Sequence, residues 1–354
     1  MADDRVALGA AAIPEPDRDW LAAVERLPIS SVWQGGHVLP PSATGEAMTR
    51  LALMTAWTER VRVGTAVLML PLYHPVLAAK QLADLDSRSG GRVVAGVGVG
   101  GEFPQEFAAL GVPVRERGAR ADESIEVLRK LWRGGSVSHK GRFFAFDGVE
   151  LRPVRHGDGP GMRAGGPPIV VSGRKEPAMR RAARLGDGWL PYLVSPEAYA
   201  RSVRTIKDEA AALGRDLTGF EWAVYLYCSV RADRERARAD VAGFLGSAYG
   251  DKPPELLDRI APSGTPEEVA ARIQTYVDAG ARHIVISPAA HEDTLDIVRL
   301  AAQEVLPRLT LPSASTPAPA ASALAASAAS ASAAAPASGP ASSVGAAALP
   351  GGSA

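Results

Sequence analysis

Two hydrophobic patterns alternate along most of the chain. Short apolar runs are typical of buried strands, and longer segments with apolar positions three and four residues apart are typical of amphipathic helices. The clearest case lies between Arg60 and Gly101, where the apolar runs Val61–Leu70 and Val93–Val99 flank one amphipathic segment, Val76–Ser87. This order predicts a β-α-β unit of a parallel sheet.

The same order repeats along the chain as far as residue 306. The predicted strand and helix pairs are Val6–Ile13 with Asp17–Arg26, Ile29–Trp33 with Gly45–Thr58, Val61–Leu70 with Val76–Ser87, Val93–Val99 with Ala119–Leu131, Ile169–Val171 with Pro177–Leu185, a short strand around Trp189 with Pro196–Ala212, Glu221–Val230 with Arg234–Gly246, and His283–Ser287 with Asp293–Leu306. Eight parallel strands alternating with helices predict an α/β fold of the (β/α)8 barrel type. A doubly wound sheet is the alternative, because a strand count alone does not close a barrel.

Several segments do not fit the simple repeat. Residues Val137–Leu151 read as a hairpin, and an extra helix is predicted at Pro266–Ala279, where Thr265 begins a capping box. The longest insertions follow the fourth strand, at Gly100–Gly118, and the seventh, at Ser247–Gly264.

Residues 310–354 differ in composition from the rest of the chain. They are Ala, Ser, Pro, Gly, Leu, Val and Thr only, without a charged residue. This composition has no periodic apolar face and is rich in helix breakers, so it predicts a disordered tail. The predicted organisation is therefore one barrel domain over residues 1–309 and a tail over residues 310–354.

Charge and composition exclude several classes of protein. Lysine plus arginine number 39 and aspartate plus glutamate also number 39, and no basic stripe with interleaved aromatic residues suggests a nucleic-acid partner. The apolar run of the acidic N-terminus stops at Pro14, so it is neither a signal peptide nor a membrane span. The single cysteine, Cys228, excludes an internal disulfide. We therefore expect a soluble, cytoplasmic protein.

Barrel geometry directs the search for chemistry to the loops that follow the strands. His37 lies in such a loop, after the second predicted strand, where a histidine can exchange a proton with a bound reactant. A structural role is the alternative for any lone histidine. His74 is as readily explained by loop packing, His283 by structure at the start of a strand, and His291 is a weaker pocket candidate. No role is assigned to two further histidines, His139 and His156, and no histidine or carboxylate cluster has the spacing of a metal site.

Two loops are candidates for cofactor binding. Gly96–Gly101 matches the glycine pattern of a dinucleotide site, but it follows the fourth strand and does not open directly into a helix. We favour a flat surface against which a ring system or phosphate lies, and the alternative is that the glycines relieve crowding at the end of a core strand. Ser172, Gly173 and Arg174 follow the fifth strand and lead into a helix, which suits a phosphate or is an ordinary turn.

Aromatic residues follow the later strands. Trp189 and Tyr192 lie near the end of the sixth strand and are candidates for the wall of an apolar substrate pocket, with packing of the barrel rim as the alternative. Tyr225 and Tyr227 share one face of the seventh strand.

A set of short motifs spread over the chain resembles one known family. The motifs are Gly64–Pro71, His74-Pro75, Ala79-Lys80, Leu85-Asp86, Ser89–Arg92, Phe107–Gly111, Arg117-Gly118, Leu128-Arg129 with Leu131-Trp132, and Gly186–Trp189. Together they are similar to the bacterial luciferase-like family of flavin- and deazaflavin-dependent oxidoreductases, over about Val6 to Leu309. The resemblance implies a (β/α)8 barrel and, from family analogy, a homodimer.

The resemblance also implies site residues. It places a non-prolyl cis peptide at Ala66–Val67, and these residues with Gly98 and Val99 would hold the flavin ring. Ser172, Gly173 and Arg174 would hold the phosphate, and His37 matches the catalytic histidine. Deazaflavin-using relatives commonly have an acidic residue where this chain has Gly36, and often a tryptophan where it has Gly100-Gly101-Glu102.

Three functions follow from this resemblance. The first is a monooxygenase that uses reduced flavin mononucleotide (FMN) from a separate flavin reductase, with O2, on a small organic substrate. The second is a hydride-transfer oxidoreductase that uses the deazaflavin F420. The third is a non-catalytic flavin-binding subunit. Oxygen consumption distinguishes the first two, and tight flavin binding without turnover would favour the third.

Overall fold

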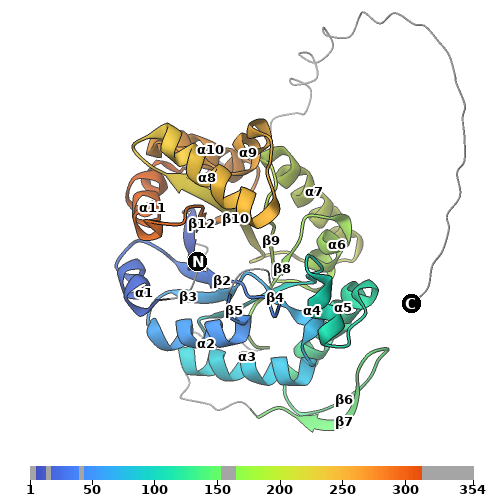
Figure 1. The fold of residues 1–354 in the computed structure, drawn as a ribbon. Helices are drawn as coiled ribbons and strands as arrows, with labels where there is room; N and C mark the ends of the chain where they lie inside the picture. The colour runs from blue at the N-terminus through green and yellow to red at the C-terminus, as the bar shows by residue number, and fades with distance from the viewer. Residues whose placement is uncertain (1–4, 13–16, 40–43, 153–164, 313–354) are drawn as a thin grey trace, which may run out of the picture. The chain divides into compact units, whose positions relative to one another are not determined.

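The computed structural model describes residues 5–12, 17–39, 44–152 and 165–312. Within them, parallel strands form a closed barrel, and Figure 1 shows helices around it. The barrel strands, in spatial order, are β1 (Ala7–Ala11), β2 (Ser31–Gln34), β3 (Arg62–Thr65) continued by β4 (Leu68–Met69), β5 (Val93–Gly98), β8 (Ile169–Ser172), β9 (Gly188–Leu190), β10 (Glu221–Val230) and β12 (His283–Pro288).

Two pairings close the ring. Strand β12 lies parallel to β1, with Ala7 opposite His283, and β9 lies parallel to β10, with Trp189 opposite Trp222. A doubly wound sheet would leave two open edges, so this closure confirms the (β/α)8 barrel and excludes the alternative.

The helices follow the predicted order with small shifts of boundary. They are α1 (Arg18–Glu25), α2 (Ala47–Trp57), α3 (Pro75–Ser89), α5 (Arg117–Trp132), α6 (Glu176–Leu185), α7 (Pro196–Ala212), α8 (Arg234–Tyr249), α10 (Pro266–Asp278) and α11 (Thr294–Leu300), the last continuing as a π-helical turn (Ala301–Val305) and a 3₁₀ turn (Leu306–Arg308). The predicted capping box is present: Thr265 accepts from the Glu268 N–H, and the Glu268 side chain accepts from the Thr265 N–H. None of the described helices combines the length and apolar character needed to cross a membrane.

Insertions account for the remaining elements. The predicted hairpin is an antiparallel pair, β6 (Ser136–Lys140) and β7 (Ala145–Glu150). The loop after β5 contains a short helix, α4 (Pro104–Ala109), and the loop after α8 contains α9 (Pro254–Ile260) and β11 (Ser263–Gly264), none of which was predicted. Two further 3₁₀ turns occupy Leu70–Leu72 and Val114–Glu116. The predicted tail lies outside the described residues from 313 onward, so the boundary at 309 stays a prediction.

The barrel interior is filled by one apolar layer. It consists of Trp33, Val94, Val170, Leu190, Ala223 and Val285. The Trp33 ring requires a glycine on the neighbouring strand, because a Cβ at Gly64 would lie 2.4 Å from its Cε3 atom. A separate and larger apolar layer joins the outer face of the strands to the helices.

A chain of hydrogen bonds closes the end of the barrel where the strands begin. Arg62 donates to both oxygens of Glu221, at 3.2 and 2.8 Å, and Nδ1 of His283 lies 2.7 Å from the same carboxylate. On its other side, Nε2 of His283 lies 2.8 Å from Oγ of Ser31, which accepts from the Trp33 indole at 2.7 Å. Burial alone would raise the pKa of Glu221, but the His283 hydrogen bond and the charge of Arg62 hold it well below its usual range.

The end of the described chain is held near the same end of the barrel. The side-chain amide of Gln274, near the end of α10, donates to the Thr310 carbonyl at 2.8 Å and accepts from the Thr310 N–H at 3.0 Å. Helix α10 leads directly into the start of β12, so this amide clamp lies toward the N-terminal ends of the strands.

Candidate active site

His37 lies in the loop after β2, at the opposite end of the barrel from the Glu221 network. Its side chain is 34% exposed. Its ring meets the edge of Phe103, from the loop after β5, with ring centroids 4.8 Å apart. Two βα-loops therefore meet at the histidine that the sequence singled out.

The partner of His37 is Glu106, which sequence reasoning missed. Glu106 lies on the short helix α4, and its side chain is fully buried. Its carboxylate oxygens are each 3.2 Å from Nδ1 of His37, and Oε1 also accepts from the N–H groups of Val38 and Leu39, at 2.6 and 3.0 Å. Three donors thus compensate the burial of this carboxylate.

This arrangement defines the chemistry available to His37. A carboxylate can only accept hydrogen bonds, so Nδ1 carries the proton that faces Glu106. That leaves the lone pair on Nε2, and no described residue hydrogen-bonds to Nε2. Such a pair can take a proton from a substrate hydroxyl, and the carboxylate then stabilises the resulting imidazolium.

A second, half-buried carboxylate lies close by but is fully engaged. Glu46 caps α2 by accepting from the N–H groups of Met48 and Thr49, and it also accepts from the Tyr73 hydroxyl. Burial alone would raise the pKa of Glu46, but these hydrogen bonds lower it, whereas burial and Glu46 raise the pKa of Tyr73. Tyr73 therefore stays a neutral donor, and the pair fixes the start of α2.

The third barrel strand is interrupted where the ring site was expected. The Ala66–Val67 peptide is cis, which confirms the geometry implied by the family resemblance. Both residues are half-buried, as is Val99 at the end of β5, while Gly98 is buried. A Cβ at Gly98 would lie 2.5 Å from Cγ2 of Val67, so glycine is required there by the Val67 side chain. The role of these residues in holding a ring stays a prediction.

The predicted phosphate loop joins β8 to α6. Gly173 has a φ of 124°, a conformation that favours glycine, and its carbonyl accepts from the Trp189 indole at 2.9 Å. No side chain caps the first turn of α6, whose N-cap residue is Lys175. Ser172 is buried and Arg174 is exposed beside it. The N–H groups at the start of α6 and two cationic side chains suit an anion.

Tyr192 links three loops at the mouth of the barrel. Its hydroxyl donates to Glu102, after β5, at 2.9 Å, and the Arg174 guanidinium lies over its ring, 5.1 Å from the centroid. Burial and Glu102 raise the pKa of Tyr192 well above its usual range, so the hydroxyl remains a donor. Its ring also lies 6.5 Å from that of Tyr249.

The tyrosines of β10 continue this aromatic group. Tyr225 and Tyr227 have ring centroids 5.5 Å apart, and the Tyr227 hydroxyl lies 2.6 Å from that of Tyr249. Burial raises the pKa of Tyr227 well above its usual range. This group of neutral hydroxyls and rings lies beside Tyr192, whose backbone pairs with that of Tyr225.

Trp189 occupies a different place from the one expected. It is fully buried and stacks on Tyr199 of α7, with ring centroids 5.1 Å apart, in the layer between strands and helices. Its neighbour Leu190 faces the barrel interior instead. The prediction that Trp189 walls an open pocket is therefore corrected: it supports the phosphate loop from behind through Gly173.

The other histidines have varied surroundings. His283 is structural, as expected, and His139 pairs with Glu123 at 3.1 Å under the β6–β7 hairpin. His74 meets the edge of Phe144, and His291 is exposed. His156 lies outside the described residues.

Comparison with protein-family models gives one match. Residues 5–251 match the model described as luciferase-like monooxygenase. This span includes the loops that carry His37, Glu106 and Arg174.

Two curated relatives resemble the chain over most of its length. An F420-dependent glucose-6-phosphate dehydrogenase of Nakamurella multipartita is 29% identical over 325 residues, which cover 84% of this chain and 93% of that protein. An F420-dependent hydroxymycolic acid dehydrogenase of Mycobacterium tuberculosis is 30% identical over 314 residues, covering 81% and 82% respectively.

A solved structure has the same fold. It is an F420-dependent secondary alcohol dehydrogenase in complex with an F420–acetone adduct, and it superposes with a TM-score of 0.74 at 21% identity, over 86% of this chain and 99% of that one.

Proposed function

The chain belongs to the luciferase-like monooxygenase family, and we propose that within this family it is an F420-dependent dehydrogenase. The proposed reaction interconverts a small organic alcohol and its carbonyl compound. The coarser assignment, an oxidoreductase of this family, follows from the family match itself.

The observation that supports F420 most strongly is the set of relatives that span more than four fifths of the chain. The two described above depend on F420 by name and are dehydrogenases. The sequence alone placed reduced FMN first and F420 second. We place F420 first, because relatives that match more than four fifths of the chain use it. We give this similarity more weight than the departures from the deazaflavin pattern at Gly36 and Gly100–Glu102.

The described residues suit the cofactor in two respects. The backbone at Ala66–Val67 interrupts the third barrel strand beside Gly98, and a ring system would lie against this backbone. The uncapped start of α6, with Ser172 and Arg174, would hold the phosphate. When bound, F420 supplies two-electron hydride chemistry.

His37 is the proposed base in alcohol oxidation. The C–H bond of the carbinol breaks with its electron pair leaving as hydride, for which bound F420 would be the acceptor, and the O–H proton passes to Nε2 of His37. Glu106 is a positioning residue: it holds Nδ1 protonated and offsets the charge that the imidazolium acquires. In the reverse direction, the same nitrogen returns the proton to the carbonyl oxygen.

The decisive test compares the two cofactors under anaerobic conditions. Purified protein would be titrated with F420 and with FMN, each oxidised and reduced, and then mixed with a panel of secondary alcohols while the visible absorbance of F420 is followed. We expect preferential F420 binding and an alcohol-dependent loss of that absorbance, without oxygen uptake. Preferential binding of reduced FMN with oxygen consumption would contradict the proposal, as would tight binding with no turnover of any alcohol or carbonyl.

A matched pair of variants tests the phosphate loop. Arg174→Ala should weaken F420 binding by about tenfold, as expected for the loss of a charge-assisted hydrogen bond. Arg180→Ala, which removes an exposed arginine from the middle of α6, the helix that follows the loop, should leave F420 binding unchanged. Equal effects would locate the phosphate elsewhere.

A further inference from the structure

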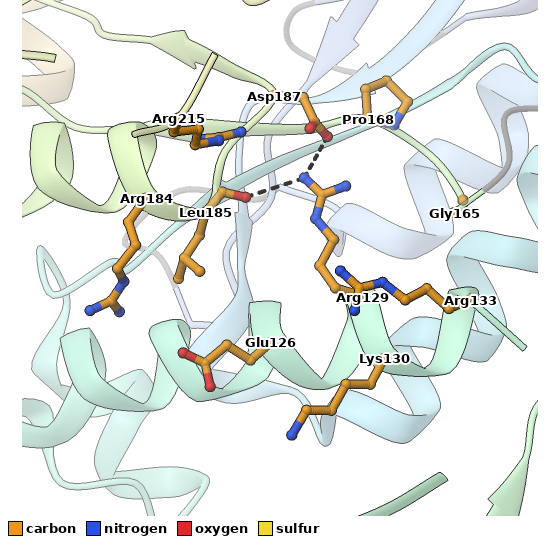
Figure 2. Close-up of a pocket in the computed structure, with 11 residues that line it drawn as sticks. Glu126, Arg129, Lys130, Arg133, Gly165, Pro168, Arg184, Leu185, Asp187 and Arg215 are labelled. Carbon is orange, nitrogen blue, oxygen red and sulfur yellow. Dashed lines mark hydrogen bonds and ion pairs between the residues drawn. The ribbon is translucent and has the colours of Figure 1, made fainter. Parts of the chain in front are cut away.

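A basic cleft lies between α5 and α6 at the N-terminal end of the barrel. Its volume is about 840 Å³, and Figure 2 shows its lining. The charged residues that line it are Glu126, Arg129, Lys130, Arg133, Arg184, Asp187 and Arg215. Their positions at the ends of helices and in the turns before β8, β9 and β10 place the cleft at the opposite end from His37.

Two of the arginines build the walls of the cleft. Arg129 donates to Asp187 at 2.6 Å and to the Leu185 carbonyl at 3.2 Å, and Figure 2 shows it reaching across from α5. Arg215 donates to three carbonyls at the end of α6, those of Ala182, Ala183 and Gly186. Burial lowers the pKa of Arg215, and the guanidinium still carries its charge at neutral pH. These contacts fix the cleft independently of any ligand.

The remaining cations are available to a ligand. No described residue pairs with the exposed side chain of Arg133. Arg184 is 49% exposed and lies 3.3 Å from Asp122, which also binds Arg181. Nζ of Lys130 lies 3.2 Å from Nδ1 of His139, and no described carboxylate pairs with this ammonium group.

The charge of the cleft is unlike that of the whole chain. Five cationic side chains face two carboxylates, a difference of +3, while the formal net charge of the protein is +0. One of the carboxylates, Asp187, is engaged by Arg129. Among the described residues that line the cleft, Glu126 is the carboxylate left to oppose an incoming anion, and it sits on α5 near Lys130 (Figure 2).

We propose that this cleft binds a small phosphate-bearing anion, either a free oligophosphate or the phosphate chain of a nucleotide. Guanidinium groups match phosphate oxygens through paired hydrogen bonds, and here they project from two different helices. The volume lies within the range of small-molecule sites. The concave shape and the position far from the barrel mouth separate this site from the one proposed for the cofactor phosphate.

Calorimetric titration of the full chain at low ionic strength would test the proposal. The probes are inorganic phosphate, inorganic pyrophosphate and ATP, with binding of pyrophosphate and ATP expected and weakening as salt is added. The Arg133→Ala/Arg184→Ala double variant should weaken pyrophosphate binding at least about tenfold, and Glu126→Gln should tighten it several-fold.

Controls separate a specific site from general charge effects. The Arg201→Ala/Arg204→Ala double variant removes the same charge from the exposed face of α7 and should bind as the original protein does. Arg174→Ala alters only the loop proposed for the cofactor phosphate, so it should leave unchanged the part of the pyrophosphate binding that the Arg133→Ala/Arg184→Ala double variant weakens. ATP binding more tightly than pyrophosphate would identify a nucleotide site, and the reverse order an oligophosphate site.

Three outcomes would overturn the proposal. They are no pyrophosphate or ATP binding by the original protein, equal losses in the cleft and α7 double variants, or a loss confined to Arg174→Ala. Because Glu126→Gln predicts a gain in affinity, a folding defect cannot imitate the expected pattern.

Discussion

The two ends of the barrel each hold a histidine bound to a buried glutamate, but the pairs are used differently. Where the strands begin, both ring nitrogens of His283 are engaged, one by Glu221 and one by Ser31, and the side chain is 5% exposed. Where the strands end, His37 uses only Nδ1, toward Glu106. The same two residue types thus form a saturated structural element at one end and an open proton acceptor at the other.

The second ring nitrogen, and not the presence of a carboxylate, separates a histidine that is open to proton exchange from one that is saturated. In the His283 pair, the Arg62 charge also neutralises the glutamate, so no proton needs to move. In the His37 pair, the carboxylate is satisfied by backbone N–H groups, which cannot titrate. Three substitutions and one change of pH test this difference between the two pairs.

Removing the open histidine should have the largest effect. We expect His37→Ala to lower kcat by about 10²- to 10⁴-fold, because the proton of the substrate hydroxyl then has no acceptor. The free energy of unfolding should change little, since the side chain is partly exposed. Steady-state kinetics with the best alcohol, together with urea unfolding, would measure both. Full turnover by this variant would remove His37 from the mechanism.

Glu106→Gln should reproduce much of that loss without removing the histidine. The oxygen that accepts from Val38 and Leu39 must stay an oxygen, so the new amide group faces Nδ1 of His37 and donates to it. The proton then moves to Nε2, the wrong tautomer for a base, and we expect kcat to fall by about 10²- to 10⁴-fold. KM and F420 affinity should be nearly unchanged. A rise in KM and a fall in cofactor affinity, with kcat unchanged, would indicate a merely structural role.

Disrupting the His283–Glu221 pair should lower stability and leave kcat nearly unchanged, the opposite of the two substitutions above. His283→Ala leaves Glu221 and Ser31 without a buried partner, and we expect it to lower the free energy of unfolding by about 2–4 kcal/mol. The kcat of the molecules that remain folded should stay within about twofold, because the pair lies at the far end of the barrel. Urea unfolding, and kinetics at urea concentrations below the unfolding transition, would test this prediction. A fall in kcat of more than about twofold in the folded protein would contradict it.

Acid should weaken the same end of the barrel through Glu221. Its folded pKa lies below the ordinary value of 4.5, so its contribution is fully present above that pH and is lost as the pH falls toward the folded pKa. The stability difference between the original protein and Glu221→Gln should therefore narrow between about pH 5 and pH 3. Urea unfolding midpoints of both proteins, measured across this pH range, would show the narrowing. A stability difference that stays constant with pH would mean that the Glu221 charge contributes nothing.

Much of the fold was predictable because strong local signals agree with the tertiary structure. The strand Glu221–Val230 and the helix Pro196–Ala212 have the predicted bounds, the first from its long apolar run and the second from the Ser195-Pro196 start. Helix α4 was missed because six residues cannot display a helical period. Only the Pro104 at its first position hinted at a helix start.

The site was less predictable because it depends on short elements and on contacts between distant parts of the sequence. Glu106 is brought to His37 by α4 across 69 positions of sequence, and nothing local in the chain marks that contact. Trp189 was misplaced because β9 has three residues, too few for alternation to tell which face a side chain occupies. His37 itself was found because barrel geometry assigns its loop to the catalytic end.

The amide clamp between Gln274 and Thr310 has a practical consequence for handling the enzyme on surfaces. A linker or solid support attached beyond Thr310 would leave the barrel beside the end of α10, on the side remote from His37. Immobilised molecules would then present their reactive loops outward, toward the bulk solution. A biosensor or flow-reactor support joined directly after Thr310 would therefore leave the loops around His37 unobstructed.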